Sequence, residues 1–241
     1  MKTVVVLPTY NEAQNLPRMI RALLSLRLDG LEVLVVDDGS PDGTGEIADN
    51  LSKEYPGRVH ALHRKGKMGL GSAYKVGFEW SLQRGADYVV QMDCDFSHPL
   101  EKIPEMVRLA AENEVVIGSR YVPGGGVDKK WNARRKALSS WGNRYARFVT
   151  GIKVKDVTGG FKCWSRKALE GIPLSRIGAG GFTFQIEMNY VARLKGYRMA
   201  EVPIQFVERE RGQSKMSMGI IVEGLWRVWQ MRFKKYLQAF V

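Results

Sequence analysis

Residues 3–40 read TVVVLPTYNEAQNLPRMIRALLSLRLDGLEVLVVDDGS, and this stretch decides the fold class. A short, valine-rich apolar run from Thr3 to Leu7 ends at Pro8 and is followed by leucine and isoleucine at helical spacing. A second apolar run, from Glu32 to Val36, ends in a cluster of aspartate, glycine and serine. Short continuous apolar runs are typical of strands that are buried on both faces. The stretch therefore predicts a strand, a helix and a second strand parallel to the first.

The alternation of strand and helix continues to about residue 118. Helices are predicted at 44–55, 71–83 and 99–112, and strands at 59–62, 88–92 and 115–117. The pattern then becomes looser and predicts a basic helix at 133–150, a turn into a short strand at 158–161, a helix at 182–194, a strand at 198–207 and a helix at 216–236. We expect one Rossmann-like α/β domain over residues 1–215, with a mostly parallel sheet and helices on both faces, and a C-terminal amphipathic helical tail over residues 216–241.

The composition excludes several classes of protein. Of the 241 residues, 44% are hydrophobic and 26% are charged, which excludes disordered, collagen-like, coiled-coil and disulfide-framework chains. The two cysteines, Cys94 and Cys163, are far apart and form no CxxC pair, so a zinc site or a disulfide scaffold is disfavoured and a reducing cytoplasm is favoured. Neither a cleavable leader nor an uncharged stretch of about 18 residues is present, so we expect no signal peptide and no spanning helix.

The excess of positive charge is local. The chain carries a net charge of +12, and residues 127–155 contain nine basic residues against the single acid Asp128. A basic excess indicates a polyanionic partner such as nucleic acid, anionic lipid or a phosphorylated substrate. Because the charge is concentrated in one segment, it favours a binding site over a generally adhesive surface. The alternative is that the basic helix only presents a solvated charged face.

Three polar clusters follow predicted strands, at residues 8–12, 37–40 and 93–95. Ligands bind outside the carboxyl ends of strands in open parallel sheets, so we expect these clusters to converge on one crevice. Any one of them could be a helix cap, but several carboxylates gathered together repel one another unless a cation or ligand donors balance them. Asp93 and Asp95 flank a single residue, and such a pair suits Mg²⁺ or Mn²⁺.

Other phosphate-binding and catalytic motifs are missing from the sequence. Ala61 stands where a P-loop ending at Gly66-Lys67 would need glycine. Neither G-x-G-x-x-G after the first strand nor G-x-S-x-G occurs, which removes support for a dinucleotide oxidoreductase and for a serine hydrolase. The three histidines are predicted to be surface or supporting groups rather than a zinc triad; they are His60, His63 and His98.

The segments at 8–12, 35–44 and 92–95 resemble the family 2 glycosyltransferases, which have the GT-A fold. Further segments narrow the resemblance to the dolichol-phosphate (polyprenol-phosphate) mannose synthases; they are 69–71, 97–99, 118–121, 206–209 and 214–215. The likeness covers residues 3 to about 216. It implies metal-dependent, inverting transfer of mannose from GDP-mannose to dolichyl or polyprenyl monophosphate, with Mg²⁺ or Mn²⁺.

The resemblance also implies roles for individual residues. The nucleotide-sugar pocket would comprise Pro8, Tyr10, Glu12, Val36, Asp38, Asp93, Cys94, Asp95, Arg120, Arg209 and Lys215. The metal would lie at Asp93, Asp95 and Ser97, and the acceptor phosphate at Arg120, Arg135 and Ser139. The catalytic residues would be Asp95, Arg120, Arg209 and Lys215. The three basic residues could offset the negative charge of the leaving diphosphate and of the acceptor phosphate. A phosphate nucleophile is already ionised at neutral pH, so no general base is assigned.

Members of this family carry several C-terminal membrane spans, one span or none, and this chain resembles the last type. Its tail combines apolar residues with Arg227 and Arg232, which suits either a helix lying among lipid headgroups or a core helix that caps the domain. We expect peripheral association with the cytoplasmic face of a membrane through its anionic surface, a small membrane-anchoring subunit as a candidate partner, and no nucleic acid.

Two other functions stay open at the level of sequence. One is transfer of glucose from UDP-glucose to the same lipid phosphate. The other is a non-catalytic basic module that binds lipid or nucleic acid. The Asp93 and Asp95 pair disfavours the second, since a simple polyanion binder has no use for clustered acids.

Overall fold

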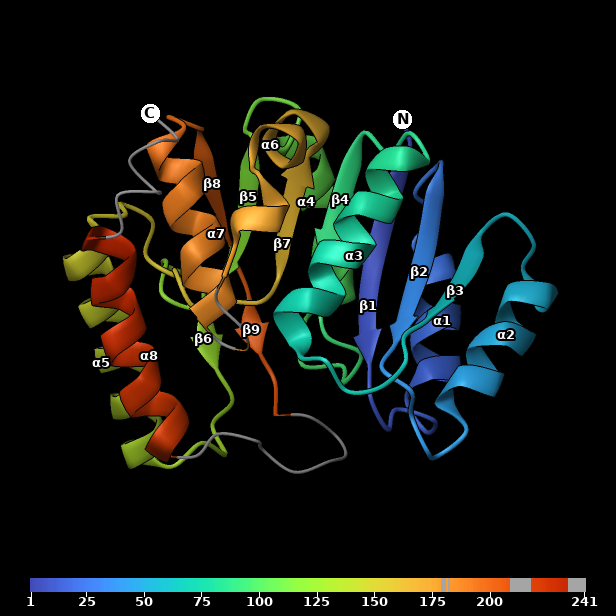
Figure 1. Ribbon diagram of the computed structural model, residues 1–241, viewed down its shortest axis with the longest axis horizontal. Helices are drawn as coiled ribbons and strands as arrows, with labels where there is room; N and C mark the ends of the chain where they lie inside the picture. The colour runs from blue at the N-terminus through green and yellow to red at the C-terminus, as the bar shows by residue number, and fades with distance from the viewer. Residues whose placement is uncertain (179–180, 182, 209–217, 234–241) are drawn as a thin grey trace.

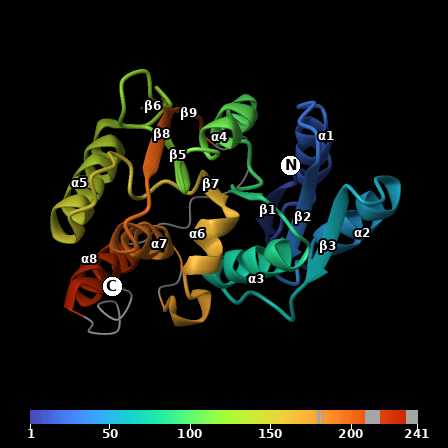
Figure 2. The ribbon, with the colours of Figure 1, turned by 90° about the horizontal axis from the view of Figure 1, so that it is seen from above.

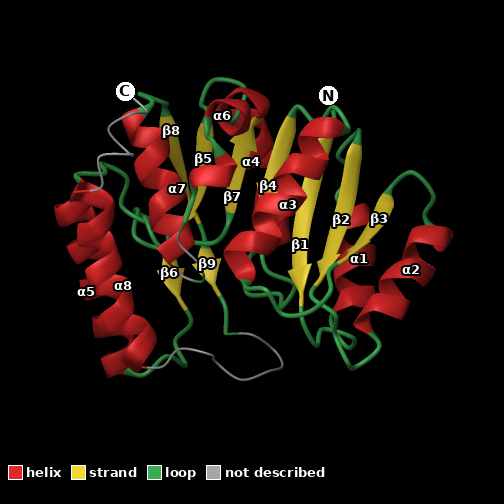
Figure 3. Cartoon of the chain, in the orientation of Figure 1, coloured by secondary structure: helices red, strands yellow, loops and turns green. Residues whose placement is uncertain are grey.

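A seven-stranded sheet with helices on both faces forms the body of the molecule in the computed structural model (Figures 1 and 3). The structure describes residues 1–178, 181, 183–208 and 218–233. The strand order is β3-β2-β1-β4-β7-β5-β8, and only β7 runs against the others, so the predicted mostly parallel α/β sheet is confirmed. The strands are β1 (Thr3–Thr9), β2 (Leu31–Asp37), β3 (Val59–His63), β4 (Tyr88–Gln91), β5 (Val115–Ser119), β7 (Lys162–Ser165) and β8 (Met199–Pro203).

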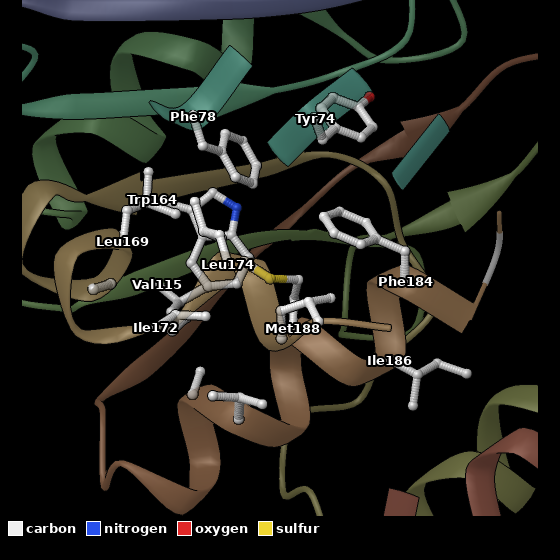
Figure 4. Packing of buried hydrophobic residues seen from close by; sticks show 14 of the residues in the cluster. Tyr74, Phe78, Val115, Trp164, Leu169, Ile172, Leu174, Phe184, Ile186 and Met188 are labelled. Carbon is white, nitrogen blue, oxygen red and sulfur yellow. The ribbon is translucent and has the colours of Figure 1, made fainter. Parts of the chain in front are cut away.

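The helices form two layers, which are separated by the sheet when the molecule is viewed from above (Figure 2). One layer consists of α1 (Leu16–Leu24), α2 (Thr44–Glu54) and α4 (Ile103–Leu109). The other consists of α3 (Leu70–Gln83), α5 (Ala133–Thr150), α6 (Arg166–Gly171), α7 (Thr183–Leu194) and α8 (Met218–Phe233), with the short 3-10 helix η2 (Leu174–Arg176) nearby. The second layer buries the aromatic core drawn in Figure 4, which includes Tyr74, Phe78, Trp164 and Phe184.

Alternate residues of the central strands supply the two cores. Val4 and Val6 of β1 belong to the core under α3, whereas Val5 and Leu7 belong to the core under α1. Successive side chains of a strand point to opposite faces, so a strand covered on both sides must be apolar throughout. This requirement explains the continuous apolar run with which the sequence begins.

Two predicted elements are divided in the structure. The helix expected at 99–112 is a 3-10 turn, η1 (Leu100–Lys102), followed by α4, because Pro104 lacks an N–H and stands in the first turn of the new helix. The strand expected at 198–207 is β8 followed by β9 (Gln205–Phe206). Ile204 N–H donates to the Ser119 carbonyl at the end of β5, and the chain then pairs with β6 (Gly126–Val127) instead.

The basic helix predicted at 133–150 has these bounds as α5. Asn132 Oδ1 accepts a hydrogen bond from Arg135 N–H at 2.8 Å and caps its first turn. Gly151, with φ +66°, ends the helix in the left-handed conformation that glycine adopts readily. The α8 helix packs against α5, and the two lie side by side at one end of the molecule (Figure 1).

Candidate active site

The polar clusters predicted after β1, β2 and β4 lie at one edge of the sheet. These three strands are adjacent and parallel, so their carboxyl ends meet there (Figure 3). The basic residue Arg120 follows β5 at the same edge, on the far side of β7. The candidate site therefore has an acidic half and a basic half.

Asp37 organises the loops of the acidic half from within. Its carboxylate accepts hydrogen bonds from Thr9 Oγ1 at 3.1 Å, Ser40 N–H at 3.0 Å and Ser40 Oγ at 2.5 Å. Ser40 Oγ in turn accepts from Asn11 N–H at 3.0 Å, and Asn11 adopts a positive φ of +62°. Asp37 thus fixes the β1 and β2 loops against each other.

Asp38, the predicted nucleotide residue, forms an ion pair. Arg64 Nη1 donates to Asp38 Oδ1 at 2.7 Å, and Met68 N–H donates to Oδ2 at 3.2 Å. Burial raises the pKa of Asp38, and the Arg64 guanidinium partly opposes this shift. Arg64 was not predicted, although its position directly after β3, at the same sheet edge, was a signal that could have identified it.

The other predicted nucleotide residues surround this pair. Lys67 Nζ lies 4.7 Å from the centre of the Tyr10 ring, so a cation occupies a face that was expected to meet a base. Glu12 accepts a hydrogen bond from Asn15 Nδ2 at 2.8 Å. The Pro8 backbone pairs with Val36 across β1 and β2, and the Val36 side chain lies wholly in the core. A ligand contact at Val36 would therefore come from its backbone.

The Asp93 to Asp95 segment follows β4 and turns sharply. Tyr74 OH donates to Asp93 Oδ1 at 3.1 Å, and Ser97 N–H donates to Asp95 Oδ1 at 3.0 Å. Phe96, between the acid pair and Ser97, has a left-handed φ of +60°. Burial raises the pKa of the Cys94 thiol well above its usual value, so its thiol is protonated and packs as a core group.

A buried histidine supports this segment from behind. Asp93 N–H donates to His98 Nδ1 at 3.3 Å, and burial lowers the pKa of His98, which favours the neutral imidazole that this bond requires. His98 also stacks on Phe161, with ring centres 5.0 Å apart. The other two histidines, His60 and His63, lie on β3, which β2 and β1 separate from the β4 end where His98 lies.

The donor set for a metal is small. Within the ranges that the structure describes, no group of three or more His, Cys, Asp or Glu side chains is arranged to hold a metal ion. The Ser97 hydroxyl is buried and makes no hydrogen bond there. Two carboxylates and an unsatisfied hydroxyl fit an ion that takes its remaining ligands from water and a bound phosphate.

In the basic half, Arg120 is linked to Ser139 through one tyrosine. The guanidinium carbon of Arg120 lies 5.3 Å from the centre of the Tyr121 ring. Tyr121 OH lies 2.8 Å from Ser139 Oγ on α5. Two of the three predicted acceptor residues, on different elements, therefore belong to one cluster.

Arg135, the third, joins the same cluster through aromatic rings. Its guanidinium carbon lies 3.8 Å from the centre of the Trp131 ring, and Trp131 packs edge-on against Phe206 of β9. The guanidinium carbon of Arg120 is 5.6 Å from that Phe206 ring. Arg135 Nη1 also pairs with Glu208 at 2.6 Å. These rings could not be placed beside the cations from the sequence, because the pairing of β6 with β9, which brings Phe206 here, has no local signal.

Arg209 and Lys215, the other two predicted phosphate-binding cations, lie outside the described residues.

A model of the family "Glycosyl transferase family 2" matches residues 4–172. The chain belongs to this family. It is 45% identical, over 96% of its length, to a polyprenol monophosphomannose synthase of Mycolicibacterium smegmatis, of which it covers 88%. It is 44% identical, over 93% of its length, to an undecaprenyl-phosphate mannosyltransferase of Micrococcus luteus, of which it covers 91%. The resemblance to polyprenol-phosphate mannose synthases is confirmed, and the protein is a glycosyltransferase.

Solved structures of glucosyl-3-phosphoglycerate synthase from Mycobacterium tuberculosis share the fold of this family 2 glycosyltransferase. The complex of that enzyme with Mn²⁺, UDP-glucose and phosphoglyceric acid superposes with a TM-score of 0.66 over 96% of this chain and 79% of the other, at 18% identity. The predicted GT-A-type architecture is therefore confirmed. In the part of the glycosyltransferase that the structure describes, no helix has the length and apolar character needed to cross a membrane.

Proposed function

We propose that the protein transfers mannose from GDP-mannose to dolichyl or polyprenyl monophosphate, with inversion at the anomeric carbon. The two relatives above are named for polyprenyl-phosphate substrates and mannose, and they cover nearly the whole chain. The observation that carries the proposal is the cluster of Arg120, Arg135 and Ser139 on the basic side of the Asp93 and Asp95 pair. It offers two guanidinium groups and a hydroxyl to a second phosphate, as a phosphate acceptor requires.

Catalysis in this proposal rests on charge and alignment. The acceptor phosphate is already an anion at neutral pH, so the protein needs to orient it rather than deprotonate it. The guanidinium groups of the basic half would hold the acceptor opposite the diphosphate. Arg209 and Lys215 complete the proposal as cations for the departing diphosphate.

The proposal includes Mg²⁺ or Mn²⁺, held by Asp93 and Asp95 with Ser97 beside them. The ion would neutralise charge on the leaving diphosphate. Asp95 is 5% exposed and Cys94 2% exposed, so this segment is firmly seated in the protein. The Asp38 and Arg64 pair, together with Pro8, Tyr10, Glu12 and the Val36 backbone, would contact the nucleoside.

We further propose that α5 and α8 bring the enzyme to the cytoplasmic face of a membrane. Tyr145 OH of α5 donates to the Leu225 carbonyl of α8 at 3.0 Å, while Val228 and Met231 of α8 are buried. Both helices also carry large exposed apolar groups, which we call the aromatic face: Leu138, Trp141, Phe148, Trp226, Trp229 and Phe233. Because Arg135 and Ser139 lie on α5 itself, a lipid phosphate at this surface would be close to the proposed acceptor site.

Product analysis tests the donor and the acceptor together. The purified chain would receive GDP-mannose or UDP-glucose in parallel, each with a polyprenyl phosphate and with Mg²⁺, Mn²⁺ or EDTA. We expect polyprenyl-phosphate mannose from GDP-mannose only, and none with EDTA. Glucose transfer from UDP-glucose would replace the proposed donor. Binding of lipid without transfer from either donor would overturn the enzymatic proposal.

A further inference from the structure

A buried carboxylate outside the predicted site carries an unusual number of hydrogen bonds. The side chain of Asp156, in the loop between α5 and β7, has 0% exposure. It accepts six hydrogen bonds, from three groups of Arg120, from the N–H and hydroxyl of Thr158 and from Gly159 N–H. A buried carboxylate needs such partners to be stable, and these six donors satisfy both oxygens of Asp156.

The geometry of the Arg120 contact is a two-point fork. Nε donates to Asp156 Oδ2 at 2.7 Å, and Nη2 donates to Oδ1 at 2.8 Å, while the Arg120 backbone N–H donates to Oδ2 at 3.0 Å. Nη2 also donates to Thr158 Oγ1 at 2.8 Å. Across the described part of the chain, the remaining nitrogen Nη1 makes no hydrogen bond. A bidentate contact fixes the plane of the guanidinium as well as its position.

The loop that presents Asp156 is itself anchored. Glu201 of β8 accepts hydrogen bonds from the N–H groups of Lys155 at 2.7 Å and Asp156 at 2.9 Å. Val157 N–H donates to Asn143 Oδ1 of α5 at 2.9 Å. The carboxylate is therefore held between a strand of the sheet and the helix that carries Ser139, and it cannot follow Arg120 if that side chain moves.

Both partners are charged in this arrangement. Burial alone would raise the pKa of Asp156, but the guanidinium holds it below its ordinary value, and Asp156 likewise holds the pKa of Arg120 above its ordinary value despite burial. The rings of Tyr121 and Phe206 lie over the same guanidinium. Asp156 thus holds the Nε and Nη2 side of the Arg120 guanidinium, and the two rings cover its faces. Nη1 is left as the nitrogen that can bind a ligand.

We propose that Asp156 is a positioning residue for acceptor recognition, which fixes the Arg120 guanidinium so that Nη1 can bind the phosphate of the acceptor. The inference rests on the proposed function, because it takes a prenyl phosphate as the ligand. A merely structural ion pair would stabilise the loop without affecting the acceptor.

Asp156→Asn tests the inference because the amide keeps the size of the side chain but presents an N–H₂ group to one arm of the fork. The matched control is Glu114→Gln. Glu114 is a buried carboxylate just before the start of β5, the strand that Arg120 follows. It pairs with Lys167 at 2.9 Å, at the opposite edge of the sheet from Arg120. Both variants should melt at lower temperature than the wild type. Only Asp156→Asn should raise the acceptor KM, by about tenfold, with the GDP-mannose KM within twofold.

Two further measurements complete the test. The double variant Asp156→Asn with Arg120→Lys should raise the acceptor KM no more than Arg120→Lys alone, because both changes remove the same alignment. Thr158→Val removes a smaller part of the hydrogen-bond network and should raise the acceptor KM about threefold. This variant replaces Asp156→Asn in the test if Asp156→Asn does not fold. An unchanged acceptor KM in a folded Asp156→Asn protein, or additive effects in the double variant, would overturn the inference.

Direct binding separates this inference from the proposed function. The Kd of a short-chain prenyl phosphate would be measured by calorimetry without donor. Three results together would support the inference even if no mannose is transferred: the wild type binds the prenyl phosphate, Asp156→Asn raises the Kd about tenfold, and Glu114→Gln leaves the Kd unchanged. If the folded wild type does not bind prenyl phosphate, the inference is wrong.

Discussion

Neighbouring residues of the same type have different roles at this site. Asp37 and Asp38 are adjacent, yet Asp37 satisfies loop donors from Thr9 and Ser40, whereas Asp38 pairs with Arg64 from the next strand. Asp37 is the last residue of β2, whereas Asp38 is the first residue beyond it, so the two side chains meet different neighbours. The sequence could place both carboxylates at the sheet edge, but it could not show that Thr9 bonds Asp37 and Arg64 bonds Asp38, since these two partners come from segments distant in the chain.

At the same scale, Asp95 tests the acidic half. Asp95→Ala should reduce transfer at least ~100-fold even with saturating Mn²⁺, as expected when a charge-stabilising group is removed. Stability should fall by only about 1 kcal/mol, because the change leaves Ser97 N–H without its acceptor. Initial rates and a urea denaturation curve measure the two effects. Asp87→Ala, at the other end of β4, is the control and should keep full activity. Wild-type turnover in Asp95→Ala would contradict the assignment.

Lys162 is a buried base whose contribution to the stability of the protein depends on pH. Its Nζ donates to the Gln185 carbonyl at 3.2 Å and to Gln185 Oε1 at 2.7 Å, and burial lowers its pKa to about 7. The unfolded chain therefore binds more protons between about pH 7 and the ordinary lysine value of 10.5, so stability should rise with pH across this window. Lys162→Met should stabilise the protein at pH 6 by about 1–4 kcal/mol, the range seen when buried charges are replaced by apolar groups.

Urea denaturation of both proteins from pH 6 to pH 9 checks this prediction. The advantage of the Lys162→Met variant should shrink as the pH rises, because above about pH 7 the folded wild type loses the lysine proton while the unfolded chain keeps it, and the wild type gains stability. A difference that stays constant over this range would show that Lys162 does not titrate as its burial implies.

At the scale of elements, local pattern and long-range pairing were not equally predictable. The parallel strands and α5 have strong local signals: continuous apolar runs in the first case, and Asn132 and Gly151 at the two ends in the second. The antiparallel direction of β7 and the β6–β9 pair depend on contacts between residues far apart in sequence. Asp156 and Phe206 became identifiable as neighbours of Arg120 only when those contacts were known.

Two helical glycines should respond to alanine with opposite signs. A Cβ at Gly77 of α3 would lie 2.4 Å from Val6 Cγ1 in the core, whereas a Cβ at Gly142 of α5 would meet nothing within 4 Å. Alanine is intrinsically better than glycine in a helix by about 1 kcal/mol. Gly142→Ala should therefore stabilise by roughly 0.5–1 kcal/mol. Gly77→Ala should destabilise by about 1–2 kcal/mol, because overpacking costs ~1–3 kcal/mol.

Urea denaturation of the two variants measures the free energy of unfolding. A gain in both would mean that β1 and α3 separate easily at Gly77. A loss in both would mean that Gly142 has a role that its open surroundings do not reveal.

At the scale of the whole molecule, acidic and basic groups are separated along the carboxyl edge of the sheet. In the proposed function the β1 and β2 loops would contact the nucleoside, the β4 loop would present carboxylates to the diphosphate, and the cations beyond β7, next to α5, would bind the acceptor. The tail was predicted to lie either in lipid or on the core. In the structure one side of α8 packs on the core, since Val228 is buried, while Trp226 on another side is 66% exposed; contact of that side with lipid stays a prediction. Sequence periodicity could not decide this, because both sides of α8 are apolar.

The aromatic face of α5 and α8 predicts reversible membrane binding. Exposed indole rings favour the interface, and basic residues near an anionic surface contribute about 1 kcal/mol each. Neither contribution alone holds a protein firmly, so binding should depend on salt. We expect the chain to co-sediment with anionic vesicles at low salt and to detach at high salt. Replacing both Trp226 and Trp229 by alanine should weaken binding at least tenfold, or ~1.4 kcal/mol, because two large apolar groups lose their contact with lipid.

Controls distinguish docking from loss of fold. Met68→Ala removes an apolar side chain of similar exposure, 65%, from the loop after β3 and should leave vesicle binding unchanged. The double tryptophan variant should melt close to the wild-type temperature, since Val228 and Met231 hold α8 in place. Unfolding of that variant would mean that the tryptophans belong to the core. If the wild type does not bind anionic vesicles at low salt, the aromatic face does not dock on lipid by itself, and a membrane-anchoring subunit would have to bring the enzyme to its acceptor.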